Sequence, residues 1–191
     1  MKKDILFNTA ATFTNSLKAQ EKLEADIPHC RVEFSVSFLT FAKQTGVFPD
    51  ISISFDQINP DFSDSKVLFT ADVKTLNMNH PERNDHLQSE NFFNSTKYPF
   101  IKFENKSFDK VDINRFLMIG DLTIKGVTLS SAFNVTWAGE TTDPITKEHL
   151  YIFNLNGTFK RLDFGVGTDF PELAIGNDIN LDASIVLKKL N

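Results

Sequence analysis

The chain has 191 residues and a formal net charge of -5, a size that suits one domain with a substantial core. Acidic and basic residues are interspersed, so the sequence lacks both the basic patch of nucleic-acid-binding proteins and the polybasic segment that binds anionic lipids. No stretch approaches the roughly 20 apolar residues of a transmembrane helix. We therefore expect no nucleic-acid partner and no stable membrane insertion.

The N-terminal residues predict an extension rather than a targeting signal. Polar residues between Asp4 and Thr14 interrupt any apolar run long enough for a secretory signal peptide. The single cysteine, Cys30, excludes an intrachain disulfide and suits a reducing compartment. We therefore expect a cytoplasmic protein with an N-terminal extension over residues 1–25. An apolar stripe at helical spacing predicts one amphipathic helix there and consists of Leu6, Ala10, Phe13 and Leu17.

From Arg31 onward the chain alternates apolar and polar residues with the period of half-buried strands. We count about eight such runs, separated by turn signals such as Asn156-Gly157 and Gly176-Asn177. Many strands joined by short turns predict an all-β domain over residues 26–191, either a closed barrel or a two-sheet sandwich, and we favour an eight-stranded antiparallel barrel. The runs 32–38 and 179–187 should be neighbours that face one interior, because the first and last strands of a barrel remove each other's free edge.

Phenylalanine dominates the apolar faces, with 20 Phe against one Trp and two Tyr. Such residues supply apolar area without the polar groups of Tyr and Trp. An eight-stranded barrel can be filled by its own side chains or can hold one small apolar ligand. Composition leaves a filled core and a phenylalanine-lined cavity both open.

The stretch 83–103 interrupts the strand pattern and is the best candidate for a functional site. Its first half mixes capping residues with Leu87, Phe92 and Phe93, which predicts a short helical insertion. Its second half alternates like a strand, with Ile101 and Phe103 on one face. The three apolar residues are expected to plug one barrel mouth.

Two polar residues of this stretch can recognise a ligand head group. Arg83 can make a charge-assisted contact with a pyrophosphate, and His86 can donate a hydrogen bond to a pyrophosphate or a quinone. The structural alternative is that both residues tie the helical insertion to neighbouring loops. Histidine spacings do not fit a metal site, and none is expected.

Four segments resemble the YceI family of lipocalin-like barrels. DIPHCRVEFSV at 26–36 is similar to the family's opening motif, and the central stretch follows the family's order and spacing at Arg83, His86, Leu87, Phe92, Phe93, Tyr98, Pro99 and Phe103. GDLTIKGVT at 120–128 and RLDFG at 161–165 complete the resemblance, which spans roughly residues 26–187. Asn84 stands where the family usually has Asp, and Cys30 stands where Ser is common.

The resemblance implies that the chain binds and sequesters or transports a long apolar ligand, a polyisoprenoid or an isoprenoid quinone, inside the barrel. It implies no catalysis and no cofactor other than a bound isoprenoid or fatty ligand. Family members are often periplasmic or secreted. The residues expected to bind the ligand are Arg83, His86, Leu87, Phe92, Phe93, Phe34, Val36, Phe103 and Phe164.

Three further interpretations are kept open. A small enzyme acting on a lipid-like metabolite would use His86 and Asp85 as acid and base, and a stress-related scaffold would have a filled core without ligand. Edge strands leave room for a homodimer. Arg161 and Asp163, two apart on an expected strand, are predicted to pair and to stabilise the turn that follows.

Overall fold

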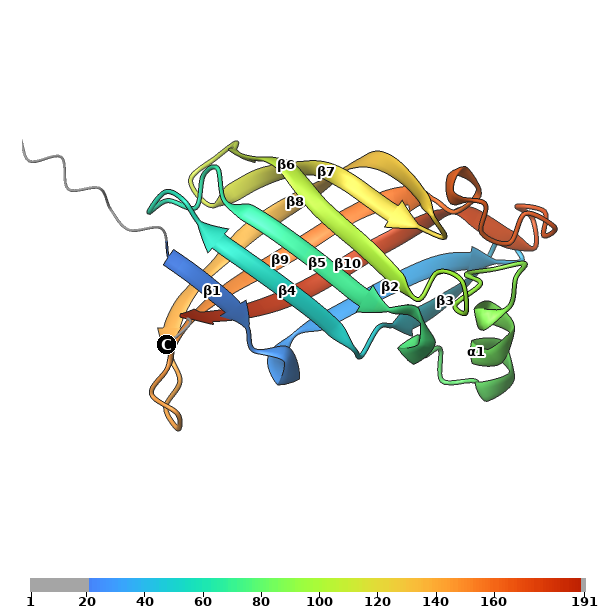
Figure 1. Ribbon diagram of the computed structural model, residues 1–191, viewed down its shortest axis with the longest axis horizontal. Helices are drawn as coiled ribbons and strands as arrows, with labels where there is room; N and C mark the ends of the chain where they lie inside the picture. Colours follow the sequence, from blue (N-terminus) through green and yellow to red (C-terminus); the bar gives the residue numbers. More distant parts are fainter. Residues whose placement is uncertain (1–20, 190–191) are drawn as a thin grey trace, which may run out of the picture.

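The computed structural model describes residues 21–189 and consists of a long antiparallel β-barrel with one α-helix at one end (Figure 1). The ten strands are β1 (Glu21–Ala25), β2 (Arg31–Phe38), β3 (Ala42–Val47), β4 (Ile51–Gln57), β5 (Lys66–Asp72), β6 (Phe100–Lys110), β7 (Arg115–Ile124), β8 (Val127–Thr142), β9 (His149–Lys160) and β10 (Ile175–Lys189). The helix is α1 (Pro81–Gln88), and short 3-10 turns are η1 (Ile27–His29), η2 (Val73–Thr75) and η3 (Leu162–Phe164).

Eight strands close the ring in the order β1-β4-β5-β6-β7-β8-β9-β10, and β1 completes it by pairing with β10. One edge of β10 is shared, because its C-terminal end pairs with β1 and the rest pairs with β2. β3 extends the sheet beyond β2. The predicted eight-stranded antiparallel barrel with a short helical insertion is confirmed.

The strands β2 and β10 are neighbours, as the sequence predicts. Val36 lies opposite Ile179, and Phe34 lies opposite Leu181, in an antiparallel register. These four side chains all face the interior cavity. The pairing hides most of one edge of each strand, as a closed barrel requires.

Two strands differ from the sequence-based expectation. β1 falls within the expected extension and pairs with β4 and β10, so the barrel begins by Glu21. Its five residues are too few to show a clear alternation. β3 was missed because its sequence, AKQTGV, has mostly polar residues on both faces. The expected N-terminal helix, Leu6 to Leu17, lies outside the described residues.

Two expected turns are wrong. Asn156-Gly157 lies inside β9 and Gly176-Asn177 lies inside β10. A Cβ atom at Gly157 would collide with the ring of Phe133, so this glycine gives space to a core residue instead of reversing the chain.

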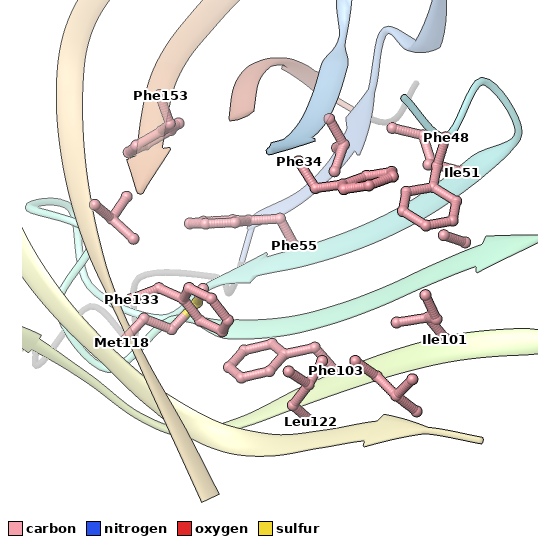
Figure 2. Packing of buried hydrophobic residues seen from close by; sticks show 14 of the residues in the cluster. Phe34, Phe48, Ile51, Phe55, Ile101, Phe103, Met118, Leu122, Phe133 and Phe153 are labelled. Carbon is pink, nitrogen blue, oxygen red and sulfur yellow. The ribbon is translucent and has the colours of Figure 1, made fainter. Parts of the chain in front are cut away.

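The interior is built mainly from phenylalanine rings that point inward from different strands. Figure 2 shows Phe34, Phe55, Phe103 and Phe133 directed from β2, β4, β6 and β8 towards the same interior. Phe103 and Phe133 meet edge to face, with ring centroids 5.2 Å apart. Such contacts between rings add stability beyond the burial of area.

Candidate functional site

The barrel encloses a cavity of about 510 Å³, so its own side chains do not fill it. Its walls come from β2 to β10 and from the α1 segment, and they are almost entirely apolar. The volume lies within the range of small-molecule sites. Of the two interiors that the sequence left open, the structure has the phenylalanine-lined cavity.

All nine residues expected to bind a ligand lie on the wall of this cavity: Phe34, Val36, Arg83, His86, Leu87, Phe92, Phe93, Phe103 and Phe164. The structure thus brings together residues from β2, α1, the segment after α1, β6 and η3. Their role in binding stays a prediction.

The helix α1 is held in place at its start and lies at one end of the barrel (Figure 1). His80 caps it, because its Nδ1 accepts a hydrogen bond from the backbone N–H of Arg83 at 3.3 Å. Pro81 occupies the first turn, where no backbone N–H is needed. Asn84 Oδ1 accepts from the backbone N–H of Met78 at 2.9 Å. Asn84 therefore ties α1 to the preceding segment through a neutral side chain.

The segment after α1 lies against the loop that follows η3. The backbone N–H of Gly167 donates to the carbonyl of Asn91 at 2.8 Å. Phe92 is buried over Gly167, where a Cβ would meet the Phe92 ring at 2.8 Å. Leu87 and Phe93 are half-buried beside it. The three apolar side chains thus lie together on the cavity wall at this mouth, and their role as a plug stays a prediction.

His86 joins two phenylalanine rings at the mouth. Its ring centroid lies 4.9 Å from that of Phe92 and 5.7 Å from that of Phe170, and the two phenylalanines are 5.2 Å apart. Phe170 also lines the cavity. Sequence reasoning missed Phe170, which stands in a loop without any periodic pattern.

Arg83 carries a charge at the mouth without a carboxylate partner among the described residues. Its Nη1 donates to Gln44 Oε1 of β3 at 2.7 Å, and within residues 21–189 it forms no ion pair. Gln44, which also lines the cavity, was missed because β3 gave no strand signal. The described lining includes no Asp or Glu, so no carboxylate on the cavity wall competes with an anionic ligand for Arg83.

Arg161 has a different role from the one predicted. It is 3% exposed, and its five N–H groups donate to backbone carbonyls. The acceptors are the carbonyl oxygens of Gly176, Val166, Gly167, Phe170 and Ile175, at 2.6 to 2.9 Å.

The predicted ion pair between Arg161 and Asp163 is wrong. Residues 162–164 form a 3-10 turn, so residues two apart do not share a face as they would on a strand, and Asp163 is exposed. Burial lowers the pKa of the Arg161 guanidinium, and the nearby Glu172 carboxylate acts in the opposite direction. With its donors used by the backbone, Arg161 shapes the mouth but has none left for a head group.

The acid and base of the enzymatic alternative are not brought together in the cavity. Both residues are exposed, and His86 lies on the cavity wall whereas Asp85 lies outside the lining. Within residues 21–189, no three His, Cys, Asp or Glu side chains are grouped to hold a metal ion. In the same part of the chain, no helix has the length and apolarity needed to cross a membrane.

Cys30 is half-buried at the junction of η1 and β2. Its Sγ accepts a hydrogen bond from the backbone N–H of Val186 at 3.4 Å and donates to the carbonyl of Val186 at 3.5 Å. Burial raises the pKa of the Cys30 thiol, and the negative charge of Asp26 acts in the same direction, although the Val186 N–H opposes them. A raised pKa lowers the fraction of reactive thiolate at neutral pH.

We expect Cys30 to react slowly with a bulky alkylating reagent in the folded protein. The measurement is the labelling rate at neutral pH, compared with the rate for the same protein in denaturant. Equal rates in the two states would show an accessible or activated thiol and would revive a nucleophilic role.

Comparisons with known proteins agree with this architecture. The model of the YceI-like domain matches residues 23–187. A relative named Protein YceI from Shigella flexneri is 32% identical over 195 residues, covering 99% of this chain and 100% of its own length.

Two solved structures show the same fold. The crystal structure of Burkholderia cenocepacia BcnA has a TM-score of 0.77 at 20% identity and covers 85% of this chain and 98% of its own. A polyisoprenoid binding domain from Saccharophagus degradans, implicated in plant cell wall breakdown, has a TM-score of 0.63 at 13% identity and covers 88% and 98%.

Proposed function

Because the chain belongs to the YceI-like family and encloses an apolar cavity, we propose that it binds and sequesters or transports a long apolar molecule, a polyisoprenoid or an isoprenoid quinone. The observation that carries this proposal is the cavity of about 510 Å³ with an almost wholly apolar wall. Each methylene moved from water into such a space gains about 0.8 kcal/mol. The barrel acts by removing the apolar part of the ligand from water.

The polar groups of the cavity give the ligand a direction. Ser37, Gln44, Arg83 and His86 lie on β2, β3 and α1, at the same end of the barrel, whereas the rest of the wall is apolar apart from the occupied Arg161. A head group that accepts hydrogen bonds therefore lies at this mouth, and the tail extends inward. Both a phosphate and a quinone carbonyl accept hydrogen bonds, and the charge of Arg83, which has no ion-pair partner within residues 21–189, favours the phosphate.

Binding is tested by native mass spectrometry and organic extraction of the purified protein. We expect a stoichiometric isoprenoid lipid in the extract, or uptake of a polyprenyl phosphate by protein that has been stripped of lipid. A protein that stays free of ligand in both experiments is not a carrier of this class.

Arg83→Ala should weaken the binding of a prenyl phosphate by roughly 1.5 to 3 kcal/mol, the value of a hydrogen bond to a charged group. The corresponding prenyl alcohol should bind as before, because the apolar wall is unchanged. The measurement is a titration of both ligands by calorimetry. His86→Ala should show the same selectivity if both residues contact the head group.

Arg31→Ala is the matched control, since Arg31 is an exposed arginine on β2 that pairs with Glu33 and does not line the cavity. It should leave the affinity for both ligands unchanged. If Arg83→Ala weakens the phosphate and the alcohol equally, Arg83 is a structural tie to β3 and does not recognise the head group.

A further inference from the structure

The cavity ends, opposite α1, at two layers of aromatic rings. The first layer, which lines the cavity, consists of Phe55, Phe108 and Phe153. The second layer, which lies behind it and does not line the cavity, consists of Phe62, Phe116, Trp137 and Tyr151. We call the two layers together the aromatic floor.

The order of the strands places these residues at the end of the barrel away from the mouth. Phe55 and Phe108 stand near the C-terminal ends of β4 and β6, and Phe153 stands near the start of β9. α1 lies beyond the opposite ends of these strands (Figure 1). The apolar tail of a ligand that enters past α1 therefore reaches the first layer at the far end of the cavity.

The first layer is continuous from ring to ring. Phe55 stacks on Phe153 with centroids 5.6 Å apart, and it meets Phe108 edge to face at 6.0 Å. All three side chains are buried. Because packed interiors resist compression, a ligand cannot push this layer aside without loss of contacts.

The second layer supports the first from behind. The ring of Phe62 lies 5.1 Å from that of Phe153 and 6.3 Å from that of Phe55, and Phe116 lies 4.9 Å from Phe108. Removing a first-layer ring therefore opens space that is still separated from solvent by the second layer.

Phe62 reaches this position from the connection between β4 and β5, which is tightly tied. Its backbone has φ +64°, a left-handed conformation that is unusual for a bulky residue. The neighbouring Asp61 carboxylate accepts hydrogen bonds from the backbone N–H and hydroxyl of Ser63, and it pairs with Lys110 at 3.0 Å. These contacts lower the pKa of Asp61 to about 2. The connection is held in the shape that inserts Phe62 into the floor.

We propose that the aromatic floor sets the longest apolar chain that the barrel accepts, with Phe153 as a residue that determines this length. The inference rests on the proposed function, because it concerns the tail of the same ligand. Carbons added to a tail gain contacts only until the tail reaches the first layer. Further carbons stay at the mouth or strain the chain.

The test uses straight-chain alkyl phosphates from decyl to tetracosyl, with affinity measured by displacement of a fluorescent fatty acid. For the unaltered protein, affinity should rise about fourfold for each added carbon, which corresponds to about 0.8 kcal/mol. Above a certain chain length it should stop rising, and we call this length the break. Phe153→Ala should move this break to longer chains. Phe153→Leu, a smaller change, should move it in the same direction by less.

Phe133→Ala is the matched control, because Phe133 is equally buried and lines the same cavity, and its ring packs against Phe103 instead of a ring of the floor. It should change affinity along the whole series without moving the break. Thermal melts show that each variant is folded at the temperature of the titration.

The outcomes separate the two proposals. If neither alkyl nor prenyl phosphates bind to the unaltered protein, the proposed function is wrong. If they bind but affinity rises without a break, or the break stays in place in both Phe153 variants, the floor does not limit length and the carrier function stands. A break that moves equally in Phe133→Ala also overturns the role of the floor.

Discussion

Arg161→Met is expected to lower the free energy of unfolding by about 4 kcal/mol or more. The substitution leaves five carbonyl oxygens without the donor that they share, and each buried group left unpaired costs about 1 to 3 kcal/mol. Part of this cost is recovered when the loop loosens and water reaches the carbonyls. Since folded proteins are stable by about 5 to 15 kcal/mol, the variant lies close to unfolding.

Arg161→Lys should not restore this stability. A lysine has one ammonium group with three donors, and it cannot reach acceptors distributed around a planar guanidinium. Arg83→Met is the matched control, since Arg83 is half-buried and its side chain makes one hydrogen bond within residues 21–189, to Gln44. We expect it to cost about 1 kcal/mol.

Urea unfolding at equilibrium measures these differences. The five acceptors lie between Val166 and Gly176, in the segment that places Phe170 against His86 and Phe92. Ligand retention should therefore fall in Arg161→Met even where the barrel stays folded. Similar unfolding midpoints for Arg161→Met and Arg83→Met would show that the mouth is held by other contacts.

The alternation of apolar and polar residues was sufficient to predict the barrel and the pairing of β2 with β10. A strand with one buried face must place every second residue inward, so Val32 to Phe38 and Ile179 to Leu187 could only share an interior. The same logic brought Phe34, Val36 and Phe103 to the cavity wall.

Local patterns failed where packing between distant residues decides the outcome. Asn156-Gly157 has the composition of a turn, but the ring of Phe133 requires the glycine inside β9. Arg161 appeared to have a partner two residues away, whereas its acceptors come from a loop whose path no periodicity predicts.

The cavity itself could not be derived from composition, because phenylalanines can fill an interior or line it. The cytoplasmic location and the homodimer stay predictions, since neither is a property of one barrel.

Phe62→Ala is expected to lower the free energy of unfolding by about 3 to 5 kcal/mol, the cost of removing a fully buried phenylalanine ring. Phe62 is 4% exposed, and its ring lies within 5.1 to 6.3 Å of the rings of Phe55, Trp137, Tyr151 and Phe153. The surrounding strands cannot collapse into the space, because their backbones are fixed by the closed ring. Phe41→Ala removes the same atoms from a side chain that is 96% exposed and should change stability by less than about 0.5 kcal/mol.

Comparing alanine with glycine at position 62 isolates the backbone contribution. Alanine keeps a Cβ in the left-handed conformation, which costs an L-residue about 1 to 2 kcal/mol, whereas glycine adopts it readily. Phe62→Gly should therefore be at least as stable as Phe62→Ala, the reverse of their usual order in a strand or helix. Urea unfolding of the three variants checks both statements. If Phe62→Ala costs no more than Phe41→Ala, the ring does not support the floor, and if glycine is clearly the worse replacement, the connection is not held in its left-handed conformation.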